Sequence, residues 1–383
     1  MSEISSFIPS RLTEARTAQS ETMRALSEKC GLSPTSISAY ESGTRVPTSR
    51  SILSVAHALE MPFEYFISER AFPIKAKGAV FFRSQASTRT RKEQDKRKQF
   101  ASWSYEVLTW LGQFVKLPAP DLPDFHLSHE PMEEYEIEEI ANKLRSHWEL
   151  TYGPISNIVT LLENKGIFVI RQPAGTKKLD AFSRVLNGRP VIFLSTEKSS
   201  SVRSRFDAAH ELGHLILHQH LTQHEISERE TLNRIEREAN AFASAFLMPE
   251  ETFSRDLIGV TLNSLQLLKK RWLVSIQALI MRCEHIGAID YEQKKRLLIQ
   301  VSSRGWRKKE PLDNIIPIEQ PRLAKNIWSL MLENSLINES TILDELKLPK
   351  KFIANIIGIE ANQLVTYSER NNIIPIELFT KET

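Results

Sequence analysis

Residues 205–220 read RFDAAHELGHLILHQH, and this stretch decides what kind of domain the chain contains. Its apolar residues recur at helical spacing, so we predict a helix. His210 and His214 lie four residues apart and therefore on one helical face, with Glu211 next to the first in an HExxH pattern. The surrounding residues are mostly alanine, leucine and isoleucine, so both imidazoles should lie inside the domain, where they need a partner.

A catalytic zinc ion takes three ligands from the protein and leaves one position for water. The two histidines therefore predict a third ligand elsewhere in the chain. The next predicted helix, residues 235–248, has one face built from a carboxylate, an amide and two small residues: Glu236, Asn240, Ala239 and Ala243. Because small residues allow close approach, we predict Glu236 as the third ligand and Asn240 as a hydrogen-bond partner of a ligand imidazole.

Three other residues are alternatives for the third ligand. Glu238 lies on a different face of the same helix, where a surface or capping role is the simpler expectation. His218 continues the four-residue series. His220 stands where HExxHxxGxxH peptidases place their third histidine, but Leu217 replaces the glycine of that motif's turn.

The residue set is typical of metal-assisted peptide hydrolysis. Zinc would polarise the scissile carbonyl and lower the pKa of its water, while Glu211 takes the proton and passes it to the leaving amine. The sequence thus predicts a zinc peptidase with Zn²⁺ as its cofactor and Glu211 as the catalytic residue. A structural zinc site, or histidines packed in a core without metal, are the other interpretations, and a structural site would not need Glu211.

RFDAAHELGHLILH followed by EREANAFASAFLMP resembles the ImmA/IrrE family of regulatory metallopeptidases. The likeness continues through LLKKRWLVSIQALIMRCEHIGAI and GWRKKEP. It implies a zincin-like domain with zinc ligands at His210, His214 and Glu236 and the catalytic carboxylate at Glu211. It also implies a specific protein substrate, such as a transcriptional repressor, in a stress response or a mobile element. Asp207 departs from the hydroxyl or apolar residue of many relatives and should alter the electrostatics near the metal.

Residues 23–66, MRALSEKCGLSPTSISAYESGTRVPTSRSILSVAHALEMPFEYF, resemble the Xre/Cro-type helix-turn-helix. Ser33 is a good N-cap and Pro34 suits a first helical position, so a helix should begin there. Met23 replaces the glutamine usual near the start of the second helix, which predicts the loss of one contact with the DNA backbone.

The helix that begins at Pro34 would present short polar side chains to DNA. We expect its N-terminal residues to meet base edges and two nearby arginines to contact phosphates. The predicted base contacts are Thr35, Ser36 and Ser38, and the predicted phosphate contacts are Arg45 and Arg50.

Four parts of the chain follow from these motifs. Residues 7–69 are predicted as an all-α helix-turn-helix domain and residues 136–311 as the peptidase domain. Residues 70–135 are predicted as a helical or linker region that contains the basic segment Ser87–Lys98, STRTRKEQDKRK, and residues 312–383 as a helical region of unknown role.

The fold class predicted is mainly α with a small antiparallel β-sheet. Three short apolar runs predict its strands: Ile167–Arg171, Asp180–Leu186 and Pro190–Ser195. A turn dipeptide at 187–188 separates the last two. The stretch 71–82 is turn-prone, and we predict no strand in it.

Composition predicts the cellular setting. With 41% hydrophobic and 25% charged residues, the chain has the balance of a globular protein. It has no apolar run of membrane-spanning length and its start lacks a signal-peptide core, so we expect a cytoplasmic protein with no membrane partner. The two cysteines, Cys30 and Cys283, predict no disulfide framework. A net charge of +3 is too small to indicate DNA binding alone, so that prediction depends on residues 7–69.

The leading hypothesis is a regulatory zinc peptidase that binds DNA and cleaves a repressor or an antitoxin-like partner, with a homodimer as one fitting assembly. Substrate recognition would use the edge of the sheet. The alternative is a transcription regulator whose zinc domain only senses a ligand or partner, against which the retained Glu211 argues. A third hypothesis is self-cleavage at a linker such as Ser84–Lys98.

Overall fold

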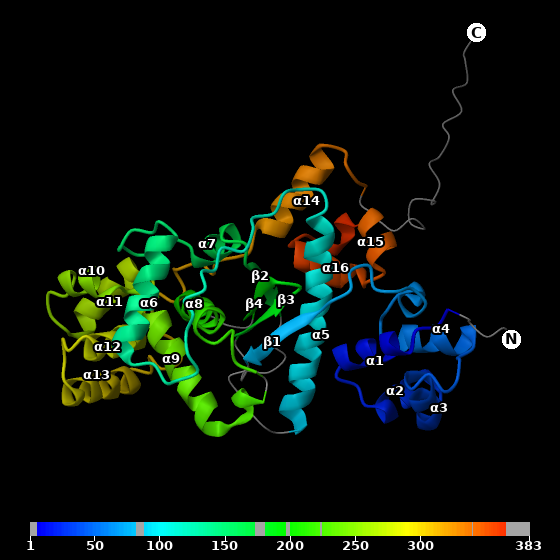
Figure 1. The fold of residues 1–383 in the computed structure, drawn as a ribbon, viewed down its shortest axis with the longest axis horizontal. Helices are drawn as coiled ribbons and strands as arrows, with labels where there is room; N and C mark the ends of the chain where they lie inside the picture. Colours follow the sequence, from blue (N-terminus) through cyan, green and yellow to red (C-terminus); the bar gives the residue numbers. More distant parts are fainter. Residues whose placement is uncertain are drawn as a thin grey trace, which may run out of the picture. The chain divides into compact units, whose positions relative to one another are not determined.

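The computed structural model describes residues 6–81, 88–172, 181–196, 200–222, 224–338 and 340–364 (Figure 1). These residues are largely helical and form one small sheet, as the predicted α+β class requires. The chain divides into two compact units: unit 1 takes Met1–Pro73, Ala86–Lys116 and Arg322–Thr383, and unit 2 takes Ile74–Gln85 and Leu117–Pro321. Within the described ranges, no helix combines the length and the apolarity that crossing a membrane requires.

Unit 1 begins with four short helices and a 3₁₀ turn: α1 (Pro9–Ala18), α2 (Met23–Cys30), α3 (Pro34–Glu41), α4 (Ser49–Ala58) and η1 (Phe63–Phe66). The Thr22 and Ser33 side chains cap α2 and α3 by accepting hydrogen bonds from Ala25 N–H and Ser36 N–H. Gly31 ends α2 with a φ of 69°, a left-handed conformation that favours glycine. The predicted helix start at Ser33 and Pro34 is confirmed.

Helix α5 (Thr88–Leu111) holds the rest of unit 1 together. It packs against α1 and against three C-terminal helices: α14 (Leu323–Glu333), α15 (Thr341–Leu346) and α16 (Lys350–Ile357). Trp103 of α5 donates its indole N–H to the Tyr65 hydroxyl at 3.1 Å and packs its ring 5.5 Å from that of Phe352. The C-terminal helices and η3 (Ala361–Gln363) are therefore part of the same unit as the first four helices.

The sheet of unit 2 has four strands in the order β1–β3–β4–β2: β1 (Ala76–Phe81), β2 (Phe168–Gln172), β3 (Ala181–Leu186) and β4 (Arg189–Ser195). β3 and β4 form the predicted antiparallel hairpin, and Asn187 and Gly188 of its turn both have positive φ, 46° and 80°. Asp180, the predicted start of this hairpin, lies outside the described residues.

The prediction of a purely antiparallel sheet is wrong, because β2 pairs with β4 in parallel. β2 is buried at every position and lies beside the inner strand β4, an arrangement typical of parallel pairing. The assignment of stretch 71–82 as a turn without a strand is also wrong. Within it, β1 pairs antiparallel with β3 from Ala76 opposite Leu186 to Phe81 opposite Ser183, with an irregularity between Lys77 and Phe81.

The helices of unit 2 are α6 (Glu134–His147), α7 (Ile158–Asn164), α8 (Ser201–Leu217), α9 (Arg229–Leu247), α10 (Glu250–Arg255), α11 (Leu262–Trp272), α12 (Ile276–His285) and α13 (Tyr291–Ser303), with η2 (Glu225–Ser227) before α9. α8 packs on β3 and β4 and against α9, which also contacts α6. A Cβ atom at Gly213 of α8 would lie 3.1 Å from Phe242 Cδ1 and 3.3 Å from Ala239 Cα of α9. The small residues thus permit the predicted close approach of these two helices.

Candidate metal centre

The three predicted ligands come together between α8 and α9. The Nε2 atoms of His210 and His214 lie 3.1 Å apart. Glu236 places Oε2 3.5 Å from His210 Nε2 and Oε1 3.5 Å from His214 Nε2. The ligand atoms of all three residues lie within 4.8 Å of one another, close enough to hold one metal ion.

Burial sets the charge of these side chains. It lowers the pKa of His214 to about 3, so the imidazole is neutral near pH 7, as a metal ligand must be. His214 therefore offers a neutral nitrogen, and Glu236 places a carboxylate beside it.

The orientation of His210 fits a zinc ligand. Its Nδ1 lies 3.1 Å from Asn240 Oδ1, an acceptor, so Nδ1 carries the proton and Nε2 presents its lone pair toward His214 and Glu236. This is the contact predicted for Asn240. Zinc with Zn–N bonds of about 2.0–2.1 Å and tetrahedral angles separates two nitrogens by about 3.3 Å, close to the spacing found here. Converging lone pairs beside a carboxylate are best stabilised by a cation, so the donor set fits zinc.

Glu211 lies next to this group without being part of it. Burial raises its pKa to about 8; His210 opposes this shift, while Glu236 and Asp207 add to it. Asp207 thus influences the electrostatics of the site, as the sequence predicted. Glu211 Oε2 is buried and accepts no hydrogen bond from the described residues, which is costly for a carboxylate with only a structural role. Ser183 of β3 donates its hydroxyl to the Glu211 main-chain oxygen at 3.4 Å, so β3 passes close to this residue.

The alternative ligands lie elsewhere or have other partners. The ring of His220 packs 4.6 Å from that of His129, and His220 is not in the ligand group. His218 Nδ1 lies 3.0 Å from His214 Nδ1, and His218 Nε2 lies 2.9 Å from Glu238 Oε2. Glu238 is only 5% exposed, so the expectation of a surface role is wrong. The sequence feature that pointed to the contact between His214 and His218 was their four-residue spacing, which continues the series that begins at His210.

The predicted DNA-contacting residues lie on α3, just after it and, for the exposed Arg50, in the first turn of α4. Thr35, Ser38 and Arg45 are exposed, whereas Ser36 is half-buried and joins the Ser33 cap through its backbone N–H. On the opposite face, Ile37 is fully buried and holds the helix in unit 1. The exposed face is compatible with DNA contact, and the base and phosphate contacts stay predictions.

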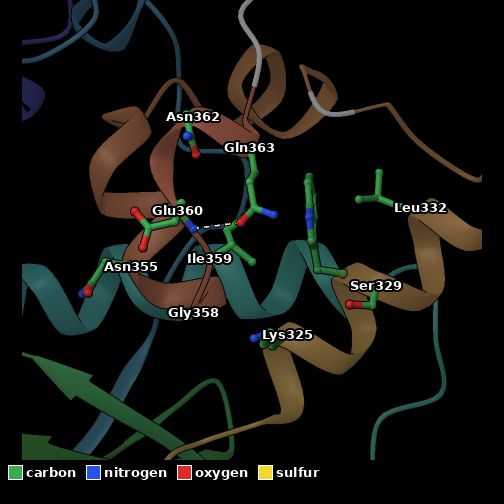
Figure 2. Close-up of a pocket in the computed structure, with 10 residues that line it drawn as sticks. Lys325, Ser329, Leu332, Asn355, Gly358, Ile359, Glu360, Asn362 and Gln363 are labelled. Atoms are coloured by element: carbon green, nitrogen blue, oxygen red, sulfur yellow. Dashed lines mark hydrogen bonds between the residues drawn. The ribbon is translucent and has the colours of Figure 1, made fainter.

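A hollow of about 770 Å³ lies in unit 1 between α14, α16 and η3 (Figure 2). Trp328 and Ile359 contribute apolar surface to it, and Lys325 and Glu360 contribute charges. The Gln363 side chain, also in its wall, accepts a hydrogen bond from Glu360 N–H at 2.9 Å. This hollow is lined by none of the residues that the sequence predicted as functional.

Two segments of the chain match known family models. Residues 162–284 match the IrrE N-terminal-like domain of the Peptidase M78 family, and residues 12–66 match the helix-turn-helix model. The chain therefore joins the two domains that its sequence resembles. The first match contains the whole candidate metal centre, and the second contains α2 and α3. No curated protein matches the chain.

Proposed function

We propose that this chain, which joins an IrrE N-terminal-like domain to a helix-turn-helix domain, is a zinc-dependent regulatory metallopeptidase. It binds DNA through residues 7–69 and hydrolyses a specific protein, such as a transcriptional repressor or an antitoxin-like partner. The observation that carries the proposal is the convergence of the His210 and His214 Nε2 atoms with the Glu236 carboxylate, beside a buried Glu211 carboxylate.

Each residue has a distinct part in the proposed reaction. Zinc, when bound by His210, His214 and Glu236, supplies the Lewis acidity that polarises a peptide carbonyl and acidifies a water molecule. Glu211 takes the proton from that water and delivers it to the leaving amine. Burial raises the pKa of the Glu211 carboxyl, which increases the proton affinity of its carboxylate. The close contact of α8 and α9 holds these groups before substrate arrives.

The position of β1 affects how a protein substrate would reach the site. β3 contacts Glu211 through Ser183, and β1 already pairs with the outer edge of β3. A substrate that adds to β3 as an extended strand would therefore have to displace β1.

The helical structure of the proposed linker argues against self-cleavage there. Residues 88–98 of this linker belong to helix α5, while residues 84–87 lie outside the described part of the chain.

Metal content followed by a cleavage screen tests the proposal. After dialysis, elemental analysis should find about one zinc per wild-type chain and almost none in His210→Ala and Glu236→Ala. The zinc-loaded wild type, added to a lysate, should then create new protein N-termini that Glu211→Gln does not create. Absence of zinc binding would overturn the proposal, and zinc binding without Glu211-dependent N-termini would favour the sensor function.

A further inference from the structure

We infer that His218 and Glu238 are positioning residues of the metal centre, which orient His214 so that its Nε2 faces the ion. This inference rests on the proposed zinc site and concerns residues that contact one of its ligands without binding the ion. The three side chains form a continuous chain of contacts: 3.0 Å between the Nδ1 atoms of His214 and His218, and 2.9 Å between His218 Nε2 and Glu238 Oε2.

The direction of these hydrogen bonds follows from the carboxylate. An ionised Glu238 can only accept, so His218 donates from Nε2 and keeps a lone pair on Nδ1. That lone pair accepts the Nδ1–H of His214, which directs the lone pair of His214 Nε2 toward the position of the metal. The opposite arrangement, with a proton on Glu238, would put a proton on His214 Nε2 and block the ligand. Only the first arrangement is compatible with zinc.

Burial and further contacts hold this chain in place. His218 is 1% exposed, and a hydrogen bond in such a water-poor environment is stronger than one at the surface. Glu238 Oε1 also accepts from Met132 N–H at 3.2 Å and lies 3.5 Å from an Arg234 guanidinium nitrogen. The segment before α6 and the helix α9 thus both fix the carboxylate, so neither Glu238 nor the His218 ring can turn without breaking several contacts.

The two histidine ligands are therefore oriented by different means. His210 donates to the neutral amide of Asn240, whereas His214 donates to an imidazole that is itself held by a carboxylate. The bond between His218 and the Glu238 carboxylate is charge-assisted, so the ring that accepts from His214 is itself firmly held. This difference explains why a third histidine follows one turn after the HExxH pair without being a ligand.

Zinc dissociation constants measured by competition with a chromogenic chelator test the inference. We expect His218→Phe and Glu238→Gln to bind zinc about 10–100-fold more weakly than the full-length wild type. His218→Gln places an amide near His214, as Asn240 does near His210, and should recover part of the affinity that His218→Phe loses. His220→Gln and Glu230→Gln change a neighbouring histidine and an exposed glutamate of α9, and should leave the affinity within about twofold.

The outcomes separate this inference from the proposed function. If the wild type binds zinc and both His218→Phe and Glu238→Gln bind it equally tightly, the positioning role is wrong and the zinc site stands. If the wild type binds no zinc, the proposed function itself fails. Circular dichroism of the metal-free proteins checks the fold. Glu238→Gln is almost the same size as the original and decides the matter if His218→Phe does not fold.

Discussion

Helices α8 and α3 carry the two sets of candidate functional residues, and they present them in opposite ways. α8 buries almost all of its residues, including His210, Glu211 and His214, whereas α3 buries only Ile37 and Tyr40. The candidate metal centre is formed by contacts within the chain, so the arrangement of its side chains is seen in the structure. The polar face of α3 is exposed to solvent, and DNA would have to supply the other half of each contact.

The difference also concerns tolerance to change. A buried site depends on each partner, because a polar group left unsatisfied in the interior costs about 1–3 kcal/mol. An exposed face loses only the contact that is removed, and neighbouring residues can compensate. We therefore expect changes in α8 and α9 to have large effects on metal binding and hydrolysis, and changes in α2 and α3 to have smaller, graded effects on DNA binding.

The largest effect is expected for Glu211→Gln. The amide keeps the size of the side chain but cannot take a proton from water, so hydrolysis should fall by about 10²–10⁴-fold. Zinc content and DNA affinity should not change, because Glu211 is outside the ligand group and in the other unit. Mass spectrometry of cleavage products and elemental analysis provide the measurements, and residual hydrolysis above one tenth of wild type would rule out this role.

The second effect concerns the contact between α8 and α9. On an exposed helix, alanine in place of glycine stabilises by about 1 kcal/mol. At Gly213 the added methyl group would meet Phe242 and Ala239 at 3.1–3.3 Å, and such overpacking typically costs about 1–3 kcal/mol. We expect Gly213→Ala to lower the free energy of unfolding and to weaken zinc binding, since Glu236 lies on the displaced helix.

Thermal and urea unfolding of metal-free protein measure this effect. Gly153→Ala is the control, because a Cβ atom there lies 3.6 Å from Thr151 Oγ1, an ordinary contact. Net stabilisation by Gly213→Ala would show that the two helices are not in the close contact that we describe.

Helical spacing explains why the sequence could predict most of the metal centre. Two local properties contain the candidate ligands: the four-residue interval from His210 to His214, and the helical face that Glu236 and Asn240 share. Packing of α8 on α9 alone is enough to bring these residues together. Glu238 was misjudged because its carboxylate accepts a hydrogen bond from Met132 N–H, more than a hundred residues earlier, and no local period reveals such a contact.

The sheet shows the same limit of local patterns. Apolar runs located β2, β3 and β4, but a run does not specify its neighbour or its direction, so the parallel pairing of β2 with β4 was missed. β1 was missed because its segment contains turn-prone residues, and it exists as a strand through pairing with β3. Strand pairing is a tertiary property that a sequence pattern does not contain.

A smaller effect is expected from a charge on the exposed face of α3. Ser38→Glu places a carboxylate where we predict contact with DNA, and should weaken binding to a random-sequence duplex about tenfold, or roughly 1.4 kcal/mol. Fluorescence anisotropy at low salt measures the affinity. Ser303→Glu introduces the same charge on an exposed residue of α13 in the other unit and is the control. Equal effects of the two substitutions would contradict a DNA-binding role of α3.

The smallest expected effect is a gain. Met23 is the first residue of α2 and is half-buried, next to the Thr22 cap. Met23→Gln adds an amide donor where we predict that a phosphate contact is missing, and a typical hydrogen bond is worth about 0.5–1.5 kcal/mol, or roughly two- to tenfold in affinity. The salt dependence of binding should not change, because glutamine adds no charge. Met23→Leu, which adds no donor, should bind as the wild type does. If Met23→Gln binds DNA no more tightly than Met23→Leu, the missing phosphate contact does not limit DNA binding. An added donor on this exposed surface would then not raise DNA affinity, unlike the graded effect that we expect there.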